Sequence, residues 1–313
     1  MEIGIDGTTE HVKLFPFAKP KGKVIAFGRD ITRFFGSGKL LGEGKDNPKL
    51  KKSQRKSFVL YLAPAKFGKL MMNGSMINTC PNASPECIAT CLNTAGNPAY
   101  LETKISSRID KTAFYYEYKD VFLTKLAREI YFQGMKFKDR EVAVRVNGTS
   151  DLAIVDEMMN KGLLKNIPKN IIFYDYTKRP ERAGVFKLKS GHYYVVTFSR
   201  SELNSDISKK LLAQGCNVAI PFRKKLPKKW HGFVVIDADK ADDLMIDLAY
   251  GKYKEIDPKT GKATGNVYTK GPSSPGYVLG LAAKGQLKKF RSKRFGAAGF
   301  VIDCDNFDNC TTG

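Results

Sequence analysis

Three of the six cysteines lie close together, in the segment NTCPNASPECIATCLNTAGN. Cys80 precedes a predicted helix, whose N-cap is Ser84 and whose first residue is Pro85. Cys87 and Cys91 are four residues apart, so a helix places both thiols on one face. A loop cysteine and such a pair can converge on one ion, although no fourth ligand is evident. We predict that Cys80, Cys87 and Cys91 bind a metal, with zinc as the first choice, an iron–sulfur cluster as the second and three buried thiols as the alternative.

A second set of reactive groups consists of aspartates that follow short apolar segments. Asp151 and Asp175 each come after such a segment, as do Asp237 and Asp239. We predict that Asp175 is a nucleophile and Asp151 a general acid/base, with Asp237 or Asp239 as substitutes. Several of these carboxylates could instead hold Mg²⁺ for phosphodiester chemistry. Each one alone could also be a helix N-cap, a role that suits Asp151 and Asp239 best.

Polar, basic and aromatic side chains accompany these aspartates. Hydroxyl and amide groups can read a base edge or a sugar, aromatic rings can stack on a base, and Lys and Arg can bind phosphate. Ordinary packing is the alternative for the rings. The predicted substrate-binding residues are Asn147, Thr149, Ser150, Tyr174, Thr177, Lys178, Ser199 and Arg200.

The elements that would position these residues are short apolar strands, each ending in polar residues and several followed by a helical stretch. This alternation indicates an α/β fold with a parallel sheet. About eight such strands favour a (β/α) barrel or a barrel-like parallel sheet, and a doubly wound open sheet is the competitor. In either fold the strand ends gather at one edge, where ligands bind. The predicted strands are 58–62, 142–146, 171–174, 194–198, 218–222, 233–236, 277–281 and 300–302, and the predicted helical stretches are 104–132, 152–164 and 207–214.

The chain divides by composition into two parts. Residues 1–56 are rich in Gly, Pro and Lys and are predicted to form a basic N-terminal arm. Residues 57–313 are predicted to form a single barrel-like catalytic domain. Within it, residues 248–275 lack periodicity and carry turn residues, so we predict an insertion or β-hairpin there.

The formal net charge of +22 exceeds what solubility requires and indicates a polyanionic partner. Nucleic acid is the expected partner, because no basic amphipathic helix with an aromatic face suggests a membrane. A solvated basic surface without a partner is the alternative. The predicted nucleic-acid contacts come from three basic clusters and are Lys51, Lys52, Arg55, Arg223, Lys224, Lys225, Lys288, Lys289 and Arg291.

The N-terminus lacks a signal-peptide pattern, and no apolar run is long enough for a membrane helix. We therefore expect a soluble intracellular protein, whose cysteines are thiols or metal ligands and not disulfides. The three histidines show no nucleophile–histidine spacing, which argues against a Ser-His-Asp or Cys-His enzyme.

Several sequence blocks resemble the bacteriophage family named for gene product 88. The resemblance implies a phage origin, and hence the host cytoplasm, but no reaction. The basic arm and the insertion look peculiar to this chain. The blocks are LYLAPAK (60–66), CPNASPECIATCLNTAG (80–96), VRVNGTSD (144–151), FYDYTKRPER (173–182), VTFSRSELN (196–204), NVAIPF (217–222), VIDAD (235–239) and GLAAKG (280–285).

A second resemblance is to the phage DNA relatives of tRNA-guanine transglycosylase, which are basic barrel enzymes with a cysteine-ligated metal. It implies that guanine in DNA is exchanged for a 7-deazaguanine-type base, that one Asp attacks the sugar C1′ and that a second Asp handles protons. The family's zinc site differs, because it lies late in the chain as C-x-C-x-x-C followed by a distant His. Base exchange on DNA is the leading hypothesis, and the alternatives are a metal-dependent nuclease or nickase and a non-enzymatic binder of single-stranded nucleic acid.

Overall fold

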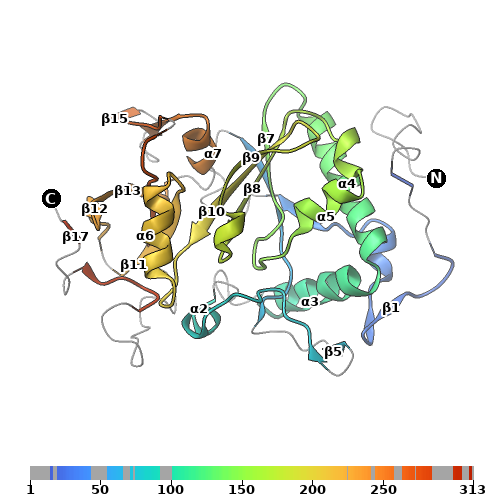
Figure 1. Cartoon of the computed structure of the whole chain (residues 1–313). Helices are drawn as coiled ribbons and strands as arrows, with labels where there is room; N and C mark the ends of the chain where they lie inside the picture. The colour runs from blue at the N-terminus through green and yellow to red at the C-terminus, as the bar shows by residue number, and fades with distance from the viewer. Residues whose placement is uncertain are drawn as a thin grey trace.

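The computed structural model of the chain contains one large sheet with helices on both of its faces (Figure 1). The residues that the structure describes are 15–16, 20–43, 55–65, 71–72, 75–91, 101–223, 225–240, 244–256, 263–271, 273–283, 299–304 and 310–311.

Seven strands run parallel at the centre of the sheet, in the order β13, β16, β11, β10, β8, β7 and β4. Most of their residues are buried in continuous apolar runs, as expected for parallel strands that are covered on both faces. Seven of the eight predicted strands are therefore confirmed, with ends shifted by up to three residues. Their bounds are β4 Lys56–Leu60, β7 Val142–Arg145, β8 Ile171–Thr177, β10 Tyr193–Ser199, β11 Val218–Phe222, β13 Phe233–Asp237 and β16 Val278–Ala282.

Antiparallel strands flank this parallel centre. β3 (Leu41–Glu43) pairs with β4 at one end, while β12 (Lys229–Trp230) pairs with β13 and β17 (Cys310–Thr311) with β12 at the other. β9 (Gly184–Lys187) is an additional partner of β10. The eighth predicted strand, residues 300–302, contributes a single parallel bridge between Ile302 and Phe222.

The sheet is open across the described residues, because its path ends at β17 and at β3 without pairing the two ends. A closed (β/α) barrel is therefore not confirmed. The order β4, β7, β8, β10, β11 does follow the chain, as it would in a barrel. The agreement between strand order and chain order ends there, because β16 lies between β11 and β13. The fold is a mixed α/β fold with a largely parallel sheet.

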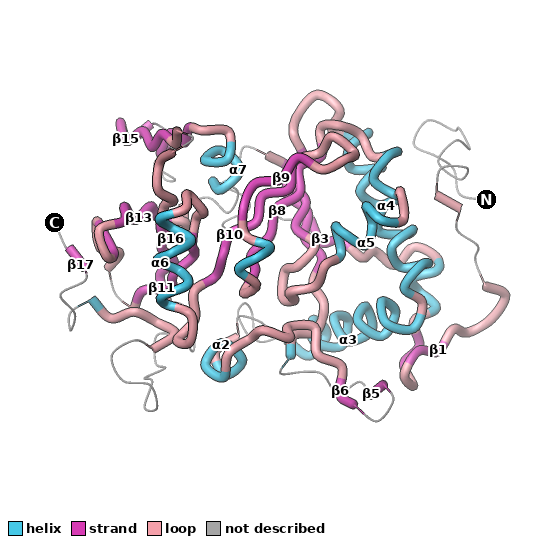
Figure 2. Tube along the Cα trace, in the orientation of Figure 1, coloured by secondary structure: helices cyan, strands magenta, loops and turns pink. Residues whose placement is uncertain are grey.

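The two faces of the sheet carry different helices. Phe173 packs on one face with α3, α4 and α5, whereas its neighbours Ile172 and Tyr174 pack on the other face with α7. α6 packs with β11 in a further cluster. Figure 2 shows α3, α4 and α5 gathered at one side of the sheet and α6 standing apart from them. The bounds are α3 Leu101–Glu117, α4 Lys119–Lys136, α5 Ile154–Asn160, α6 Ser205–Ala213 and α7 Leu244–Ala249.

The long helical stretch predicted at 104–132 is a pair of helices, α3 and α4. α3 ends at Glu117 and α4 begins at Lys119, because Tyr118 between them has a non-helical conformation (φ −125°, ψ 51°). The Tyr118 ring packs against Phe35 and Phe114. Among the described residues, no helix has the length and apolarity required to cross a membrane.

The described part of residues 1–56 packs on the core of the chain. Phe34, Phe35 and Leu40 are buried in the same core cluster as α3 and α4, and Leu41 pairs with Leu60 in the sheet. Its apolar residues explain this docking, which composition alone did not reveal. The short elements here are β1 Ile25–Ala26, β2 Arg29–Asp30 and η1 Thr32–Phe35.

The predicted insertion at about 248–275 contains a hairpin, in which β14 (Lys252–Ile256) pairs antiparallel with β15 (Ala263–Thr269). The division into a 1–56 segment and a 57–313 catalytic domain stays a prediction. The remaining short elements are β5 Met71–Met72, β6 Ser75–Met76, η7 Leu163–Asn166 and η8 Pro180–Arg182.

Candidate active site

The parallel pairing places the carboxyl ends of the seven central strands along one edge of the sheet, here called the C-terminal rim. In open α/β sheets, ligands bind outside the carboxyl ends of the strands. Asn147 follows β7, Lys178 follows β8 and Arg200 follows β10, so neighbouring strands deliver these three residues to adjacent positions. The expectation that polar strand ends gather at one edge is met for this part of the sheet.

Asp175 lies inside β8 and is almost fully buried, with 1% of its surface exposed. Its Oδ1 accepts a hydrogen bond from the backbone N–H of Asn147 at 2.9 Å, and its Oδ2 accepts from Asn147 Nδ2 at 2.9 Å and from Tyr194 Oη at 3.1 Å. Burial raises the pKa of Asp175 to about 6, although the positive charge of Arg145 acts in the opposite direction. A carboxyl group with such a pKa suits proton transfer near neutral pH.

Asp151 is also buried, and it forms an ion pair with Arg182 at 3.1 Å. Its Oδ1 also accepts from Thr177 Oγ1 at 2.8 Å, and its Oδ2 accepts from the backbone N–H of Lys178 at 2.9 Å. The other end of the Arg182 guanidinium, Nη2, donates to Tyr194 Oη at 2.9 Å. A continuous chain therefore links Asp151 through Arg182 and Tyr194 to Asp175.

Sequence reasoning did not identify Arg182 or Tyr194 as site residues. Both are drawn into the chain because burial of a charge or a hydroxyl group requires a partner. The available signal was the position of Arg182 in the polar stretch after β8, among the basic residues of FYDYTKRPER.

Lys178 is the central cation of the rim. Its Nζ donates to Ser199 Oγ at 2.7 Å and to the carbonyl oxygens of Ser199 and Arg200 at 3.0 and 3.2 Å. Burial lowers the pKa of Lys178, while the charges of Cys87, Asp151 and other acidic groups nearby oppose this shift. Lys178 is thus electrostatically coupled to both the predicted metal ligands and a predicted catalytic carboxylate.

The cysteine segment (residues 80–91) lies at the rim near Lys178. Ser84 caps the short helix α2 (Pro85–Ala89), as predicted, by accepting from the backbone N–H of Cys87. Cys91 lies beyond the end of this helix. Cys80 donates through Sγ to the Thr149 carbonyl oxygen at 3.4 Å, which ties it to the loop after β7. Burial raises the pKa of the Cys80 thiol to about 11 and also raises that of Cys87.

Glu202 attaches α2 to the end of β10. Its Oε2 accepts from Ser84 Oγ at 2.7 Å, and its Oε1 accepts from the backbone N–H of Glu86 at 3.0 Å. The carboxylate therefore sits at the helix N-terminus, where the backbone N–H groups and the helix dipole favour negative charge. Glu202 fixes the position of the helix that carries Cys87.

Residues 299–304, here called the C-terminal strap, cross the rim beside α2. The Phe300 backbone N–H donates to Glu86 Oε2 at 2.7 Å, and buried Arg200 donates through Nη1 to the Gly299 carbonyl oxygen at 2.8 Å. The Lys178 ammonium lies 5.1 Å from the centre of the Phe300 ring. The strap therefore contacts both α2 and the central cation, and Arg200 holds protein carbonyls here in place of the predicted substrate.

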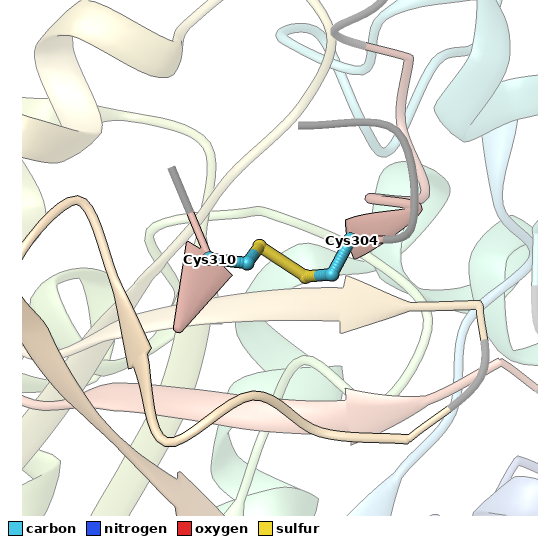
Figure 3. Close-up of a disulfide and its surroundings, with 2 residues drawn as sticks. All are labelled: Cys304 and Cys310. Atoms are coloured by element: carbon cyan, nitrogen blue, oxygen red, sulfur yellow. A yellow bond between two sulfur atoms is a disulfide. The ribbon is translucent and has the colours of Figure 1, made fainter. Parts of the chain in front are cut away.

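A disulfide between Cys304 and Cys310 links the end of the strap to β17 (Figure 3). This pairing contradicts the expectation that the cysteines are thiols or metal ligands. The two residues are six positions apart, and their Cα atoms are 5.6 Å apart, so their side chains meet. Cys80, Cys87, Cys91 and Cys216 are not part of a disulfide.

The predicted substrate-binding residues divide into two groups. Lys178 and Ser199 are half-buried at the rim. The others serve mainly internal contacts: Ser150 Oγ donates to Asn147 Oδ1, Thr149 Oγ1 donates to the Leu62 carbonyl, and Tyr174 is fully buried on the α7 face. Tyr174 faces away from Asp175 because successive residues of a strand point to opposite faces. The structure therefore does not place Tyr174 where it could stack on a base bound at Asp175.

Asp237 and Asp239 are not brought together with Asp151 and Asp175. Asp237 is the last residue of β13 and Asp239 follows it. β13 is four strands from β8, a separation of about 19 Å at the usual strand spacing. Asp237 Oδ1 accepts from the backbone N–H of Asp239 at 2.9 Å, and Asp239 Oδ2 accepts from that of Ala282 at 2.8 Å. Both carboxylates stabilise turns at a distant part of the same rim.

The predicted nucleic-acid contacts do not lie on one surface of the described structure. Arg223 and Lys225 follow β11 at the rim, where Arg223 Nε pairs with Asp303 at 3.2 Å and Lys225 is exposed. Arg55 instead precedes β4, at the opposite edge of the sheet, and it is paired with Glu141 and Asp247 at 2.9 and 2.8 Å. Arg55 therefore does not belong to the rim surface. The other predicted contacts, Lys51, Lys52, Lys224, Lys288, Lys289 and Arg291, lie outside the described residues.

Comparison with known proteins identifies the family to which the chain belongs. The family model described as gene product 88 matches residues 38–265 of the 313. The match spans the cysteine segment, the Asp151–Asp175 chain and Lys178, and it confirms the resemblance seen in the sequence blocks. Searches of curated proteins and of solved structures find no match, so neither supports the transglycosylase resemblance. The chain belongs to the gene product 88 family of bacteriophage proteins.

Proposed function

We propose that this protein is a DNA-modifying enzyme that exchanges guanine bases at the C-terminal rim. The observation that carries the proposal is the buried chain from Asp151 through Arg182 and Tyr194 to Asp175. Its Asp151 end lies beside Lys178, at the edge of the sheet where ligands bind. Two carboxyl groups in different environments are what an exchange of a base through a sugar intermediate requires.

The environments favour different roles for the two carboxyl groups. The raised pKa of Asp175 supports a role in moving protons, which leaves Asp151, the ion-pair partner of Arg182, as the candidate nucleophile. These roles are the reverse of those predicted from the sequence. In the exchange, a carboxylate oxygen bonds to C1′ as the bond to the guanine nitrogen breaks, and the incoming base then displaces the carboxylate. Because each carboxylate is held by protein donors, the attacking one must give up a partner when DNA binds.

Positive charge at the rim supports DNA as the polyanionic partner. Arg223 and Lys225 follow β11, and the net charge of the chain is +22. The basic cluster that includes Lys288 and Arg291 lies between Ala283 and Gly299 in the sequence. Both of these residues are at the rim, because Ala283 N–H donates to the Phe222 carbonyl at 2.8 Å and Gly299 accepts from Arg200.

The test is incorporation of a labelled 7-deazaguanine base into DNA by the purified protein, followed by nucleoside mass spectrometry. Asp151→Asn and Asp175→Asn are each expected to lower the rate at least about a hundredfold, a typical loss for an acid/base or nucleophile. Asp206→Asn, which changes an exposed aspartate of α6, is the matched control and is expected to incorporate the labelled base at the wild-type rate.

Three outcomes would contradict base exchange. Incorporation at the wild-type rate by both Asp151→Asn and Asp175→Asn would exclude the proposed roles. Strand cleavage that depends on a divalent cation would indicate a nuclease. Tight, salt-sensitive binding that leaves the DNA unchanged would indicate a binding protein.

A further inference from the structure

Arg182 stands between the two buried carboxyl groups of the rim. Its Nη1 donates to Asp151 Oδ1 at 3.1 Å, and its Nη2 donates to Tyr194 Oη at 2.9 Å. Tyr194 Oη in turn donates to Asp175 Oδ2 at 3.1 Å. The side chains of Arg182 and Asp151 are only 10% and 8% exposed, and Tyr194 and Asp175 are buried. Water therefore screens these groups poorly, and a change of charge on one of them acts strongly on the others.

The chemistry of the arginine fixes the direction of the hydrogen bonds in this chain. A guanidinium group can only donate, so Tyr194 Oη must accept from Arg182. The hydroxyl proton of Tyr194 is then left to point at Asp175. Because hydrogen bonds in a chain polarise one another, a hydroxyl group that accepts from a cation is a stronger donor. The positive charge of Arg182 therefore reaches Asp175 through Tyr194 and favours the ionised carboxylate.

Other charged groups face this chain from the neighbouring elements. Arg145 of β7 places positive charge near Asp175, and Asp156 of α5 places negative charge near Arg182 and Tyr194. Neither group has a part in the proposed base exchange, so their charges stay constant during the reaction. The charge that the reaction would change is that of the nucleophile.

We propose that Arg182 is a positioning residue that couples the two carboxyl groups, so that loss of the negative charge on Asp151 releases the proton of Asp175. While Asp151 is ionised, it offsets the charge of Arg182, and Asp175 retains its proton more easily. When Asp151 becomes neutral, the full charge of the guanidinium acts on Tyr194 and Asp175 and favours the carboxylate. One cation thus holds the first carboxylate and sets the proton affinity of the second.

The coupling gives base exchange an order of steps, and this use of it rests on the proposed function. As an Asp151 oxygen bonds to C1′, the carboxylate becomes a neutral ester, and the guanine nitrogen takes the electron pair of the broken bond. The same loss of charge releases the proton of Asp175 to the leaving guanine. The incoming base then gives its own proton to Asp175 and displaces the ester oxygen, which restores the negative charge on Asp151.

The test follows the ionisation of Asp175 by NMR of the side-chain carboxyl carbons, in the full-length protein labelled in its aspartates and titrated without DNA. Asp175→Asn identifies the signal. Asp151→Asn is expected to lower the midpoint of the Asp175 titration by about one pH unit, a tenfold rise in its acid dissociation constant. Asp206→Asn is the matched control, because it removes an exposed carboxylate of α6, and it is expected to leave the midpoint unchanged.

Two further variants test the coupling in case Asp151→Asn does not fold. Arg182→Gln removes the positive charge and retains an amide donor, so it is expected to raise the Asp175 midpoint by about one pH unit. Tyr194→Phe retains the buried ring and removes only the linking hydroxyl group, so it is also expected to raise the midpoint. An unchanged midpoint in a folded Asp151→Asn or Arg182→Gln protein, or a shift opposite to the expected one in any of the three variants, would overturn the inference.

The two proposals can fail separately. The titrations are read without DNA, so a protein that exchanges bases but shows no shift of the Asp175 midpoint would overturn only the coupling. A protein that shows the expected shifts but leaves labelled base out of DNA would overturn only base exchange.

Discussion

Two pairs of aspartates lie in or just after the carboxyl-terminal parts of strands of the same sheet, yet their surroundings differ. Asp151 and Asp175 are buried and joined through Arg182 and Tyr194. Asp237 and Asp239 are half-exposed, and the hydrogen bonds described for them come from backbone N–H groups of their own turn and of the neighbouring strand β16.

The difference shows that an aspartate at a strand end has two uses. In the first pair the carboxylates are assembled with other charged side chains, and burial makes each partner costly to lose. In the second pair they replace a missing backbone acceptor in a turn. What separates a candidate site from a turn is the set of side chains that the neighbouring strands bring to it.

Replacing Arg182 should produce the largest difference between the two regions. Arg182→Met removes the cation beside buried Asp151 and the donor to Tyr194, and it should lower the free energy of unfolding by about 4 kcal/mol. Urea denaturation measures this. The matched control is Arg179→Met, because Arg179 pairs with exposed Glu181 two residues away, and it should cost less than about 1 kcal/mol. Equal losses of unfolding free energy for the two variants would mean that the buried chain stabilises the fold no more than an exposed ion pair does.

The pH dependence of stability should depend on Asp175. Its pKa is raised in the folded protein from 3.8 to about 6, so between these values the unfolded chain has lost a proton that the folded protein keeps. The stability contributed by this group is therefore highest below pH 4, falls by about 3 kcal/mol as pH rises to 6 and stays low above it. Urea midpoints of the wild type and of Asp175→Asn, measured from pH 4 to pH 7, should diverge accordingly. Parallel curves would mean that the carboxyl group is not protonated in the fold near pH 5.

The smallest effects are expected at the distant turn. Asp237→Asn and Asp239→Asn keep an oxygen that can accept from the same backbone N–H groups, so each should change the free energy of unfolding by less than about 1 kcal/mol. Incorporation of labelled base into DNA should continue at the wild-type rate in both variants. A loss of incorporation comparable to that of Asp151→Asn would move the site toward β13.

The strands could be predicted because each is a short apolar run that ends in polar residues, as Val218–Phe222 shows. Their pairing could not, because an apolar run does not specify its neighbour. The segment with α7 and the β14–β15 hairpin allows the chain to return and insert β16 between β11 and β13. The expectation of a barrel failed to include this insertion and the antiparallel edge strands.

The site could be predicted only in part. The polar residues after β7 and β8 were identified from their positions, and Ser84 and Pro85 correctly located the start of α2. Arg182 and Glu202 acquire their contacts only in the folded chain, from residues 31 and 118 positions away. Long-range partners of this kind leave no periodic signal. The position of Tyr174 differs, because the alternation of side chains along a strand already predicts that it faces away from Asp175.

The position of the C-terminal strap in the sequence determines when this site can be completed during synthesis. A ribosome releases the chain from its N-terminus, so the parallel strands and α2 emerge well before Gly299 and Phe300. The contacts of Glu86 and Lys178 with Phe300 can form only after all seven central strands have been synthesised. A chain that stopped before Gly299 would therefore contain the seven central strands and the three cysteines around α2, but its rim would lack the contacts that Gly299 and Phe300 make with Arg200, Glu86 and Lys178.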